Sequence, residues 1–509
     1  MNVSFGRLAE QLKTNQIWGS PDLPISDVCF DSREAVPGSL FVALPGGYTD
    51  GHAFLADARA RGAVAALVER VTDACYSFDA FAQVPDTRAS LPLVAATFFQ
   101  RPANSLGMIG ITGTDGKTTT SYLVDALLRH AGLRAGVIGT VSVRIGDDVV
   151  EHDMRQTTPE SLEIQRLLAR MRHHQVDWAV LEATSHGLAL HRLDETPFDI
   201  GVVTNITHEH LEFHKTIEAY RRAKAMLLEK VDQSRGRSFP NGVVLNRDDE
   251  GARSIAHYAG AAPVVWFSTR DMAAGIRAET IDYRNDGTRF RLVTPDGASE
   301  AHLRLIGPFN VENALAAAGV GYWLRMSPDQ IAAGLESLAG IPGRLLRVDE
   351  GQPFTVIVDY AHTPDSLEKT LSLVKSLSTG RLCAVFGSAG ERDPTKRPLQ
   401  GAVSAKLADF SIFTSEDPRF ENPETIIRDI ARGAEAAGAV EGRDYRCIED
   451  RRAAIAAAIE WARAGDAVVL AGKGHEHCIF YGAERIPWNE AEEAAKALRM
   501  HGFTASMPT

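Results

Sequence analysis

Cysteine, basic charge and long apolar runs are all scarce in this chain of 509 residues. The five cysteines include no Cys-x-x-Cys pair, which argues against a disulfide framework or a zinc ribbon. A net charge of −12 disfavours nucleic-acid binding, because phosphate neutralisation needs a basic surface. No apolar stretch approaches the roughly 20 residues that cross a bilayer, and no signal peptide is recognisable at the N-terminus. These absences favour a cytoplasmic protein without membrane insertion.

Short β-type runs alternate with Ala- and Leu-rich helical patterns nearly throughout, which predicts an α/β fold with parallel sheets. The length suggests about three domains, and linker-like segments place them at residues 1–104, 105–343 and 344–509. A buried strand is predicted at Leu106–Ile111 in the central domain. In the last domain, strands alternate with helical patterns in the order of a dinucleotide-binding domain, although no GxGxxG motif is present. The predicted strands are Thr355–Val358, Leu382–Phe386, Phe410–Thr414 and Ala467–Ala471. We therefore expect a small N-terminal α/β domain, a central P-loop-type ATPase domain and a C-terminal Rossmann-like domain.

A glycine-containing loop stands between the first central strand and a helical pattern that ends at His130. Such a loop exposes backbone N–H groups to phosphates, and the dipole of the following helix strengthens this attraction. A lysine in the loop reaches the terminal phosphates, and a threonine hydroxyl is a suitable Mg²⁺ ligand. The general P-loop pattern fails at one position, because Ile111 replaces its first glycine. The predicted ATP-binding residues here are Gly113, Thr114, Asp115, Gly116, Lys117, Thr118 and Thr119.

The form Gly-Thr-x-Gly-Lys-Thr-Thr resembles the nucleotide loop of the Mur ligase superfamily, which makes peptide bonds with ATP. Similar motifs follow in the family's order from about Asp31 to Glu476. Within the superfamily, the chain resembles the branch that adds the third residue, a diamino acid, to UDP-MurNAc-L-Ala-D-Glu in peptidoglycan synthesis. The resemblance implies ATP, this uridine nucleotide and a diamino acid as partners, Mg²⁺ as cofactor, and a monomer.

The resemblance also implies where the uridine substrate binds. Gln156 stands where the family often has Asn, and Leu190 stands where a Gln is common, so the threonines of this set carry more weight. The implied residues are Phe30, Ser32, Gly47, Tyr48, Thr49, Gln156, Thr157, Thr158, Thr184, Leu190 and Arg192.

For catalysis, the resemblance implies that Lys117, Glu182, His210 and Lys224 act together. Thr118, Glu182, His210 and Lys224 are the implied Mg²⁺ ligands, with Lys224 carbamylated to N6-carboxylysine so that it carries negative charge. Three dense histidines, His208, His210 and His214, leave a zinc site as an alternative. Near the adenine and the hinge, the matching residues are Asn310, Asn313 and Arg344. Asp359 begins a segment that resembles the family's loop closing on the nucleotide, where it is expected to contact the ribose or orient the lid.

Which amino acid is added depends on the last domain. Arg392 resembles the arginine that binds the amino acid's carboxylate, Lys396 and Arg397 are expected to add positive potential, and Gly472 and Glu476 resemble contacts to the amino acid. The specificity motif reads Glu416, Asp417, Pro418 and Arg419, where members that add diaminopimelate usually have Asp-Asn-Pro-Arg. Arg419 suits a distal carboxylate, whereas the two acidic residues suit a side-chain ammonium. The motif leans slightly toward lysine or ornithine and leaves meso-diaminopimelate open.

Two other functions remain open at this point. A folylpolyglutamate synthase belongs to the same superfamily, although the first-domain motif and the Glu416–Arg419 segment argue against it. A P-loop ATPase without ligase activity would hydrolyse ATP and form no amide.

Overall fold

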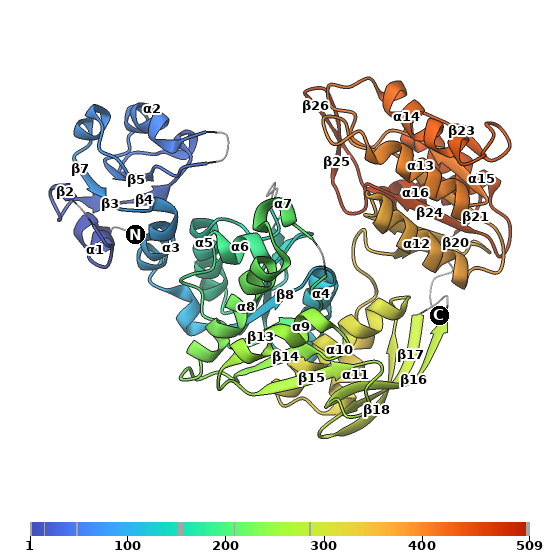
Figure 1. Ribbon diagram of the computed structural model, residues 1–509, viewed down its shortest axis with the longest axis horizontal. Helices are drawn as coiled ribbons and strands as arrows, with labels where there is room; N and C mark the ends of the chain where they lie inside the picture. Colours follow the sequence, from blue (N-terminus) through green and yellow to red (C-terminus); the bar gives the residue numbers. More distant parts are fainter. Residues whose placement is uncertain are drawn as a thin grey trace. The chain divides into compact units, whose positions relative to one another are not determined.

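The computed structural model describes residues 3–14, 16–46, 49–150, 156–207, 209–284 and 287–504. Its main sheets have five, eleven and six strands, and helices connect the strands of each (Figure 1). The chain divides into two compact units, one of Met1–Thr280, Phe290–Ala301 and Val311–Ser337, the other of Ile281–Arg289, His302–Asn310 and Leu338–Thr509. The predicted α/β class is confirmed.

The N-terminal part of the first unit contains the five-stranded sheet, in the order β2-β7-β6-β5-β4. β4 to β7 are parallel, and β2 joins β7 antiparallel at one edge. β1 and β3 form a separate pair. The elements are β1 Val3–Ser4, α1 Phe5–Ala9, β2 Gln16–Gly19, β3 Pro24–Ile25, β4 Asp27–Cys29, β5 Ser39–Val42, α2 Leu55–Ala60, β6 Ala65–Val68, β7 Ala80–Gln83 and α3 Thr87–Phe98.

The central sheet has the order β11-β10-β9-β12-β8-β13-β14-β15-β16-β17-β18. The strands from β9 to β16 in this order run parallel. β8 is buried along its whole length, which explains its continuous apolar sequence. The elements are β8 Gly107–Thr112, α4 Lys117–His130, β9 Ala135–Ile138, β10 Val143–Ile145, β11 Asp148–Val150, α5 Ser161–His173, β12 Trp178–Glu182, α6 Ser185–Ala189, β13 Ile200–Val203, α7 Leu211–His214, α8 Ile217–Gln233, β14 Gly242–Asn246, α9 Glu250–Ile255, β15 Val264–Ser268, β16 Ile276–Arg284, β17 Gly287–Thr294, β18 Gly297–Leu303, α10 Pro308–Trp323 and α11 Pro328–Glu336.

Not every central strand follows the predicted parallel pattern. β10 pairs antiparallel with both β9 and β11. β17 alternates buried and exposed positions, as a strand does when one of its faces meets solvent. The parallel prediction therefore holds for the strands that carry the phosphate loop and its neighbours.

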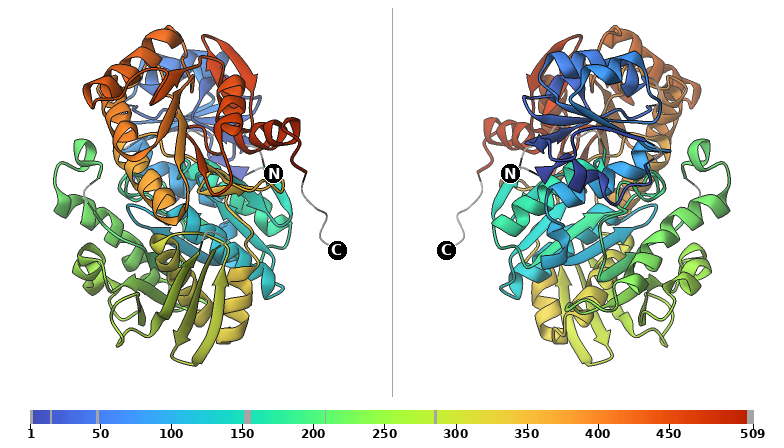
Figure 2. Two further views of the ribbon diagram at one scale, coloured as in Figure 1. Left: turned by 90° about the vertical axis from the view of Figure 1, so that its right-hand side faces the viewer. Right: turned by 90° about the vertical axis from the view of Figure 1, so that its left-hand side faces the viewer.

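The C-terminal sheet has the order β19-β20-β24-β21-β22-β23, and all its strands except β19 are parallel. Helices lie on both faces of this sheet (Figures 1 and 2). Alternate residues of β20 face opposite helix layers: Val356 and Val358 pack with α15 and α16, and Ile357 packs with α12 and α14. The elements are β19 Leu346–Val348, β20 Thr355–Asp359, α12 Pro364–Leu377, β21 Leu382–Phe386, α13 Lys396–Leu407, β22 Phe410–Phe413, α14 Pro423–Ala436, β23 Tyr445–Cys447, α15 Arg451–Trp461, β24 Ala467–Ala471, β25 Cys478–Tyr481, β26 Glu484–Pro487 and α16 Glu490–Met500.

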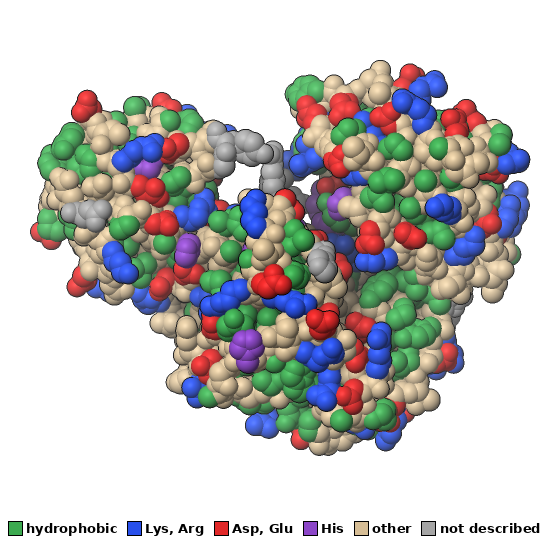
Figure 3. Space-filling model, viewed as in Figure 1, with side chains coloured by type: hydrophobic (Ala, Val, Ile, Leu, Met, Phe, Trp, Pro, Cys, Tyr) green, Lys and Arg blue, Asp and Glu red, His purple; other side chains and the backbone are tan. Residues whose placement is uncertain are grey.

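Acidic and basic side chains are interspersed on the face shown in Figure 3. Among the described helices, none has the length and apolar character that a membrane crossing requires.

Candidate active site

The phosphate loop joins β8 to α4, as predicted. Gly116 has a φ of +84°, and a Cβ there would lie 2.2 Å from Asn313 Oδ1, so only glycine fits this turn. Lys117 begins α4, and its Nζ donates to the carbonyls of Gly113 and Thr114 at 2.9 and 2.8 Å. The Thr114 hydroxyl lies 3.1 Å from that of Tyr220 and accepts from Thr207 N, so this side chain braces the loop from inside.

Glu182, the last residue of β12, connects the phosphate loop to the predicted uridine-substrate segment. It is 2% exposed, and its Oε2 accepts from the hydroxyls of Thr118 at 3.0 Å and Thr140 at 2.8 Å. Thr140 N donates to Oε1 at 3.1 Å. The Thr140 hydroxyl also lies 3.0 Å from that of Thr157. A carboxylate and three hydroxyls therefore form one continuous polar chain.

The neighbouring residues that the sequence predicts to bind the substrate are held by a second network. The Thr158 hydroxyl contacts Glu182 O at 2.7 Å and the Thr184 hydroxyl at 2.8 Å. Arg192 Nη1 donates to Thr158 O at 2.9 Å, and its Nη2 lies 3.0 Å from Glu160. Burial lowers the pKa of Arg192, although the carboxylate of Glu160 opposes this effect. The structure thus gathers Thr157, Thr158, Thr184 and Arg192, while Gln156 is exposed and Leu190 is half-buried.

Lys224 of α8 is 1% exposed and donates to Gly113 O at 2.7 Å. Its Nζ also lies 4.6 Å from the centre of the Tyr220 ring. Burial, together with the nearby charge of Lys117, lowers the pKa of Lys224 well below its ordinary value. A neutral amine is the form that acts as a nucleophile. The sequence predicts that Lys224 is carbamylated, and the structure places its side chain in a buried position beside the phosphate loop.

The histidine group differs from the predicted one. His208 lies outside the described residues. The rings of His186 and His210 are 4.8 Å apart, and those of His186 and His214 are 5.5 Å apart. Burial and these neighbours lower the pKa of His186 to about 4. In the described part of the chain, no group of three or more His, Cys, Asp or Glu residues is arranged to hold a metal ion.

The first-domain residues lie around β4 and β5. Phe30 packs at the edge of the apolar core, Ser32 is buried, and Thr49 is exposed. The sequence also predicts Gly47 and Tyr48 as substrate contacts, and both lie outside the described residues.

In the second unit, Asp359 organises the chain after β20. Its carboxylate accepts from Leu345 N at 2.8 Å, Ala361 N at 3.0 Å and the Thr370 hydroxyl at 3.0 Å. Burial raises its pKa, and these hydrogen bonds oppose the rise. These contacts show that Asp359 orients the chain around it. Arg344 lies 5.3 Å from the centre of the Tyr360 ring.

The two segments that the sequence predicts to bind the amino acid, Glu416–Arg419 and Gly472–Glu476, follow β22 and β24. Lys473 Nζ donates to Asp417 at 2.9 Å and to Glu476 at 2.6 Å, so the charge of Asp417 is compensated within the protein. Glu416 has no such partner: its Oε2 is buried and makes no hydrogen bond to the described residues. Burial raises the pKa of Glu416 to about 7. Gly472, with a φ of +101°, leaves room for this oxygen, because a Cβ would approach it to 2.6 Å. The acidic character of the motif thus rests on Glu416 and not on Asp417.

The arginines of this domain have different roles. Arg397 is 2% exposed and forms ion pairs with Glu421 at 2.8 Å and Asp429 at 3.2 Å. The positive potential that the sequence predicts for it is therefore neutralised. The guanidinium groups of Arg392 and Arg419 make no hydrogen bond or ion pair to the described residues. Pro418 is buried.

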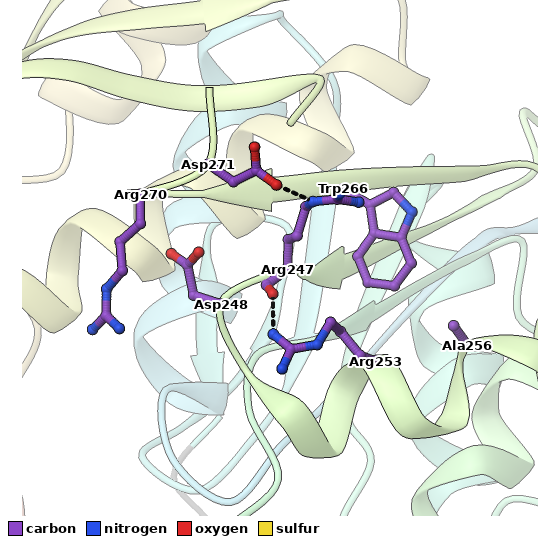
Figure 4. Close-up of a pocket in the computed structure, with 7 residues that line it drawn as sticks. All are labelled: Arg247, Asp248, Arg253, Ala256, Trp266, Arg270 and Asp271. Atoms are coloured by element: carbon purple, nitrogen blue, oxygen red, sulfur yellow. Dashed lines mark hydrogen bonds and ion pairs between the residues drawn. The ribbon is translucent and has the colours of Figure 1, made fainter. Parts of the chain in front are cut away.

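Several residues with buried polar contacts are not predicted by the sequence: Thr140, Tyr220, Arg451, Trp488 and Glu490. Arg451 and Glu490 form a fully buried ion pair. Each belongs to an unremarkable helical or loop pattern, so no local sequence signal distinguishes it. A separate recess of about 590 Å³, at the carboxyl ends of β14 and β15, contains none of the predicted residues (Figure 4). It is lined by Arg247, Asp248, Arg253, Ala256, Trp266, Arg270 and Asp271.

Three family models match the chain in sequence order. They are the catalytic domain of the Mur ligase family over residues 24–90, the Mur ligase middle domain over residues 111–321, and the Mur ligase glutamate ligase domain over residues 343–474.

Relatives match over nearly the whole chain. A UDP-N-acetylmuramyl-tripeptide synthetase from Roseiflexus sp. (strain RS-1) is 45% identical over 486 residues, which cover 94% of this chain and 95% of the relative. A UDP-N-acetylmuramoyl-L-alanyl-D-glutamate–2,6-diaminopimelate ligase from Bacillus velezensis is 40% identical over 477 residues, with 94% and 95% coverage. A solved structure of a ligase with that second name is 31% identical, with a TM-score of 0.69 and coverage of 99% and 100%.

Proposed function

Since the chain belongs to the Mur ligase family, we propose that it joins a diamino acid to UDP-MurNAc-L-Ala-D-Glu with ATP, in the synthesis of peptidoglycan precursor. The observation that carries this proposal is the hydrogen-bond chain through Glu182. It links Thr118 of the phosphate loop to Thr157 of the uridine-substrate segment, so that the two reactants would meet at one carboxylate.

The reaction that we propose has two steps. A carboxylate oxygen of the D-glutamyl residue attacks the γ-phosphorus of ATP, the bond to ADP breaks, and an acyl phosphate forms. The amine of the diamino acid then attacks the acyl carbon, an amide forms, and phosphate leaves with the bonding electron pair while the amine loses a proton. The first step brings two anions together, so positive charge at the phosphate loop is the main requirement. Lys117, at the start of α4, would supply part of it.

Mg²⁺ fits the donors found here. Thr118 and Glu182 offer the hard oxygen atoms that it prefers, and bound Mg²⁺ would neutralise charge on the phosphates. His210 completes the proposed ligand set with Lys224. A lysine amine is a poor Mg²⁺ ligand, but its neutral nitrogen can attack CO₂, lose a proton and become a carbamate anion. The lowered pKa of Lys224 favours the amine that this step needs.

Rescue chemistry tests the carbamate. We expect Lys224→Ala to lose activity and added short carboxylates to restore part of it. Full activity in the variant without any addition would contradict this role.

The second amino group of the substrate is the feature for which Glu416 is suited. Its unpartnered, buried oxygen can accept from a side-chain ammonium, which favours lysine or ornithine. A second candidate is meso-diaminopimelate, because Arg419 makes no ion pair to the described residues and suits a distal carboxylate. The name of the Bacillus velezensis relative also supports this candidate.

One assay separates these possibilities. The purified protein receives ATP, Mg²⁺ and UDP-MurNAc-L-Ala-D-Glu with L-lysine, L-ornithine or meso-diaminopimelate, and mass spectrometry identifies the product. We expect an amide with one of them at a far higher kcat/KM than with the others. Failure to form any amide would overturn the proposal. ATP hydrolysis without the uridine substrate would instead indicate an ATPase, and glutamate addition to a folate would indicate a folylpolyglutamate synthase.

A further inference from the structure

Arg451 and Glu490 form an ion pair in the core of the C-terminal domain. Their side chains are 1% and 0% exposed. Arg451 Nε lies 3.1 and 3.0 Å from the two oxygens of Glu490, and its Nη2 lies 2.7 Å from Oε1. Trp488 Nε1 donates to the other oxygen at 2.6 Å. Glu490 begins α16, where the helix dipole favours a negative charge. The carboxylate therefore fixes the orientation of the guanidinium.

The remaining donors of Arg451 reach two backbone carbonyls. Nη1 donates to Ser415 O at 3.1 Å, and Nη2 donates to Ala471 O at 2.7 Å. Ser415 immediately precedes Glu416, and Ala471 immediately precedes Gly472. Their strands, β22 and β24, are not neighbours, because β21 lies between them in the sheet. One side chain thus ties together the starting points of the two amino-acid segments.

Arg451 also acts on Glu416 electrostatically. The charged groups that face Glu416 are Lys473 and Glu476 after β24, Lys396 of α13, and Arg451 of α15. Burial raises the pKa of Glu416, whereas Lys473, Lys396 and Arg451 lower it. Loss of the guanidinium charge would therefore shift this pKa upward.

We infer that Arg451 is a positioning residue for the incoming amino acid, held in place by Glu490. It fixes the spacing between Glu416–Arg419 and Gly472–Glu476 through the carbonyls of Ser415 and Ala471. This inference rests on the proposed function, in which those segments bind the diamino acid. Binding of the amino acid would then require Arg451, although this residue lies outside both segments.

Two variants separate geometry from charge. Arg451→Lys keeps the charge but lacks the planar fork that serves Glu490 and both carbonyls at once. The double variant Arg451→Met with Glu490→Gln removes the guanidinium charge together with its partner, and the amide oxygen at position 490 can still accept from Trp488. Replacing both members of a buried ion pair is tolerated better than removing one. Steady-state kinetics are measured for each substrate, with the amino acid titrated between pH 6 and 8.5.

We expect both variants to raise the KM for the amino acid at least ~ten-fold while the KM for ATP changes less than about two-fold. Only the Met/Gln variant should move the acidic limb of the amino-acid kcat/KM profile to higher pH. Arg381→Met is the control, because it removes an ion pair with Asp466 at the amino-terminal edge of the same sheet. It should leave the KM for the amino acid unchanged.

Three results would contradict a role of Arg451 in amino-acid binding or the function on which that role rests. Variants that melt cooperatively but keep the wild-type KM for the amino acid would overturn it. Equal rises in all three KM values would also overturn it, because they would indicate general damage. If the Met/Gln variant does not fold, Arg451→Lys gives the decision. Wild-type protein that forms no amide would refute the proposed function instead.

Discussion

Replacing Lys224 with methionine should stabilise the protein while it removes activity. The Lys224 amine is buried and donates a hydrogen bond of 2.7 Å to Gly113 O, and no carboxylate pairs with it among the described residues. Methionine has a similar length and avoids the cost of burying an amine. Losing one hydrogen bond costs about 1 kcal/mol. Relief from desolvation outweighs this loss, because the buried lysine must give up its proton, which costs about 1.4 kcal/mol for each unit by which the pH lies below the pKa of the unfolded chain.

The difference in the free energy of unfolding between the wild type and Lys224→Met should depend on pH. The pKa of Lys224 lies well below the value of 10.5 that applies to the unfolded chain, so between the two values the unfolded chain binds more protons. The wild type therefore loses stability as the pH falls below the unfolded value. The loss is about 1.4 kcal/mol per pH unit as long as the folded amine stays neutral. The advantage of Lys224→Met should therefore grow as the pH falls from 9 to 8, by up to this amount.

Urea titrations in CO₂-free buffer would measure the free energy of unfolding of both proteins. Lys230→Met is a matched control: Lys230 lies on the same helix, is half-buried, donates to Asp194 O at 2.9 Å and has a pKa that burial lowers. It should show the same direction of pH dependence but keep activity, whereas Lys224→Met should lose ~100-fold or more. A stability difference that does not change with pH would refute the reasoning about Lys224.

Three further predictions concern the two binding regions. Gly116→Ala should weaken ATP binding in calorimetry by ~ten-fold or more, because a φ of +84° and a Cβ 2.2 Å from Asn313 Oδ1 force the loop to move. Thr118→Val should lower kcat by ~ten-fold or more and leave the KM for the amino acid unchanged, because it removes the hydroxyl that donates to Glu182; an unchanged kcat would contradict this. Since the pKa of Glu416 is about 7, the wild-type KM for a diamino acid should rise below pH 7 as the carboxyl becomes protonated, and Glu416→Gln should give a flat profile.

Local sequence signals predict the strands that carry the site. Leu382–Phe386 and Ala467–Ala471 match β21 and β24 at both ends, since buried parallel strands are short apolar runs. The phosphate loop is also recognisable, because its glycine, lysine and threonines are adjacent in sequence.

Contacts between distant positions are not predictable in the same way. The sequence suggests that Asp417 presents a free carboxylate, but Lys473, far away in sequence, pairs with it. Arg451 likewise reaches Ser415 and Ala471 only because the strands of one sheet bring their ends together. Such pairings depend on the order of strands, which periodicity does not encode.

The segments that would read the amino acid and the loop that would bind ATP project from separate apolar cores. The core under the phosphate loop contains β8, β12 and α8, whereas the cores of the C-terminal domain contain β20, β21 and β24, and these clusters share no residue. Substitutions that change which amino acid the protein accepts therefore need not disturb the phosphate loop or its use of ATP. A lineage could exchange the amino acid that it adds by altering positions in the Glu416–Arg419 and Gly472–Glu476 segments, while the residues around the phosphate loop stay under independent selection.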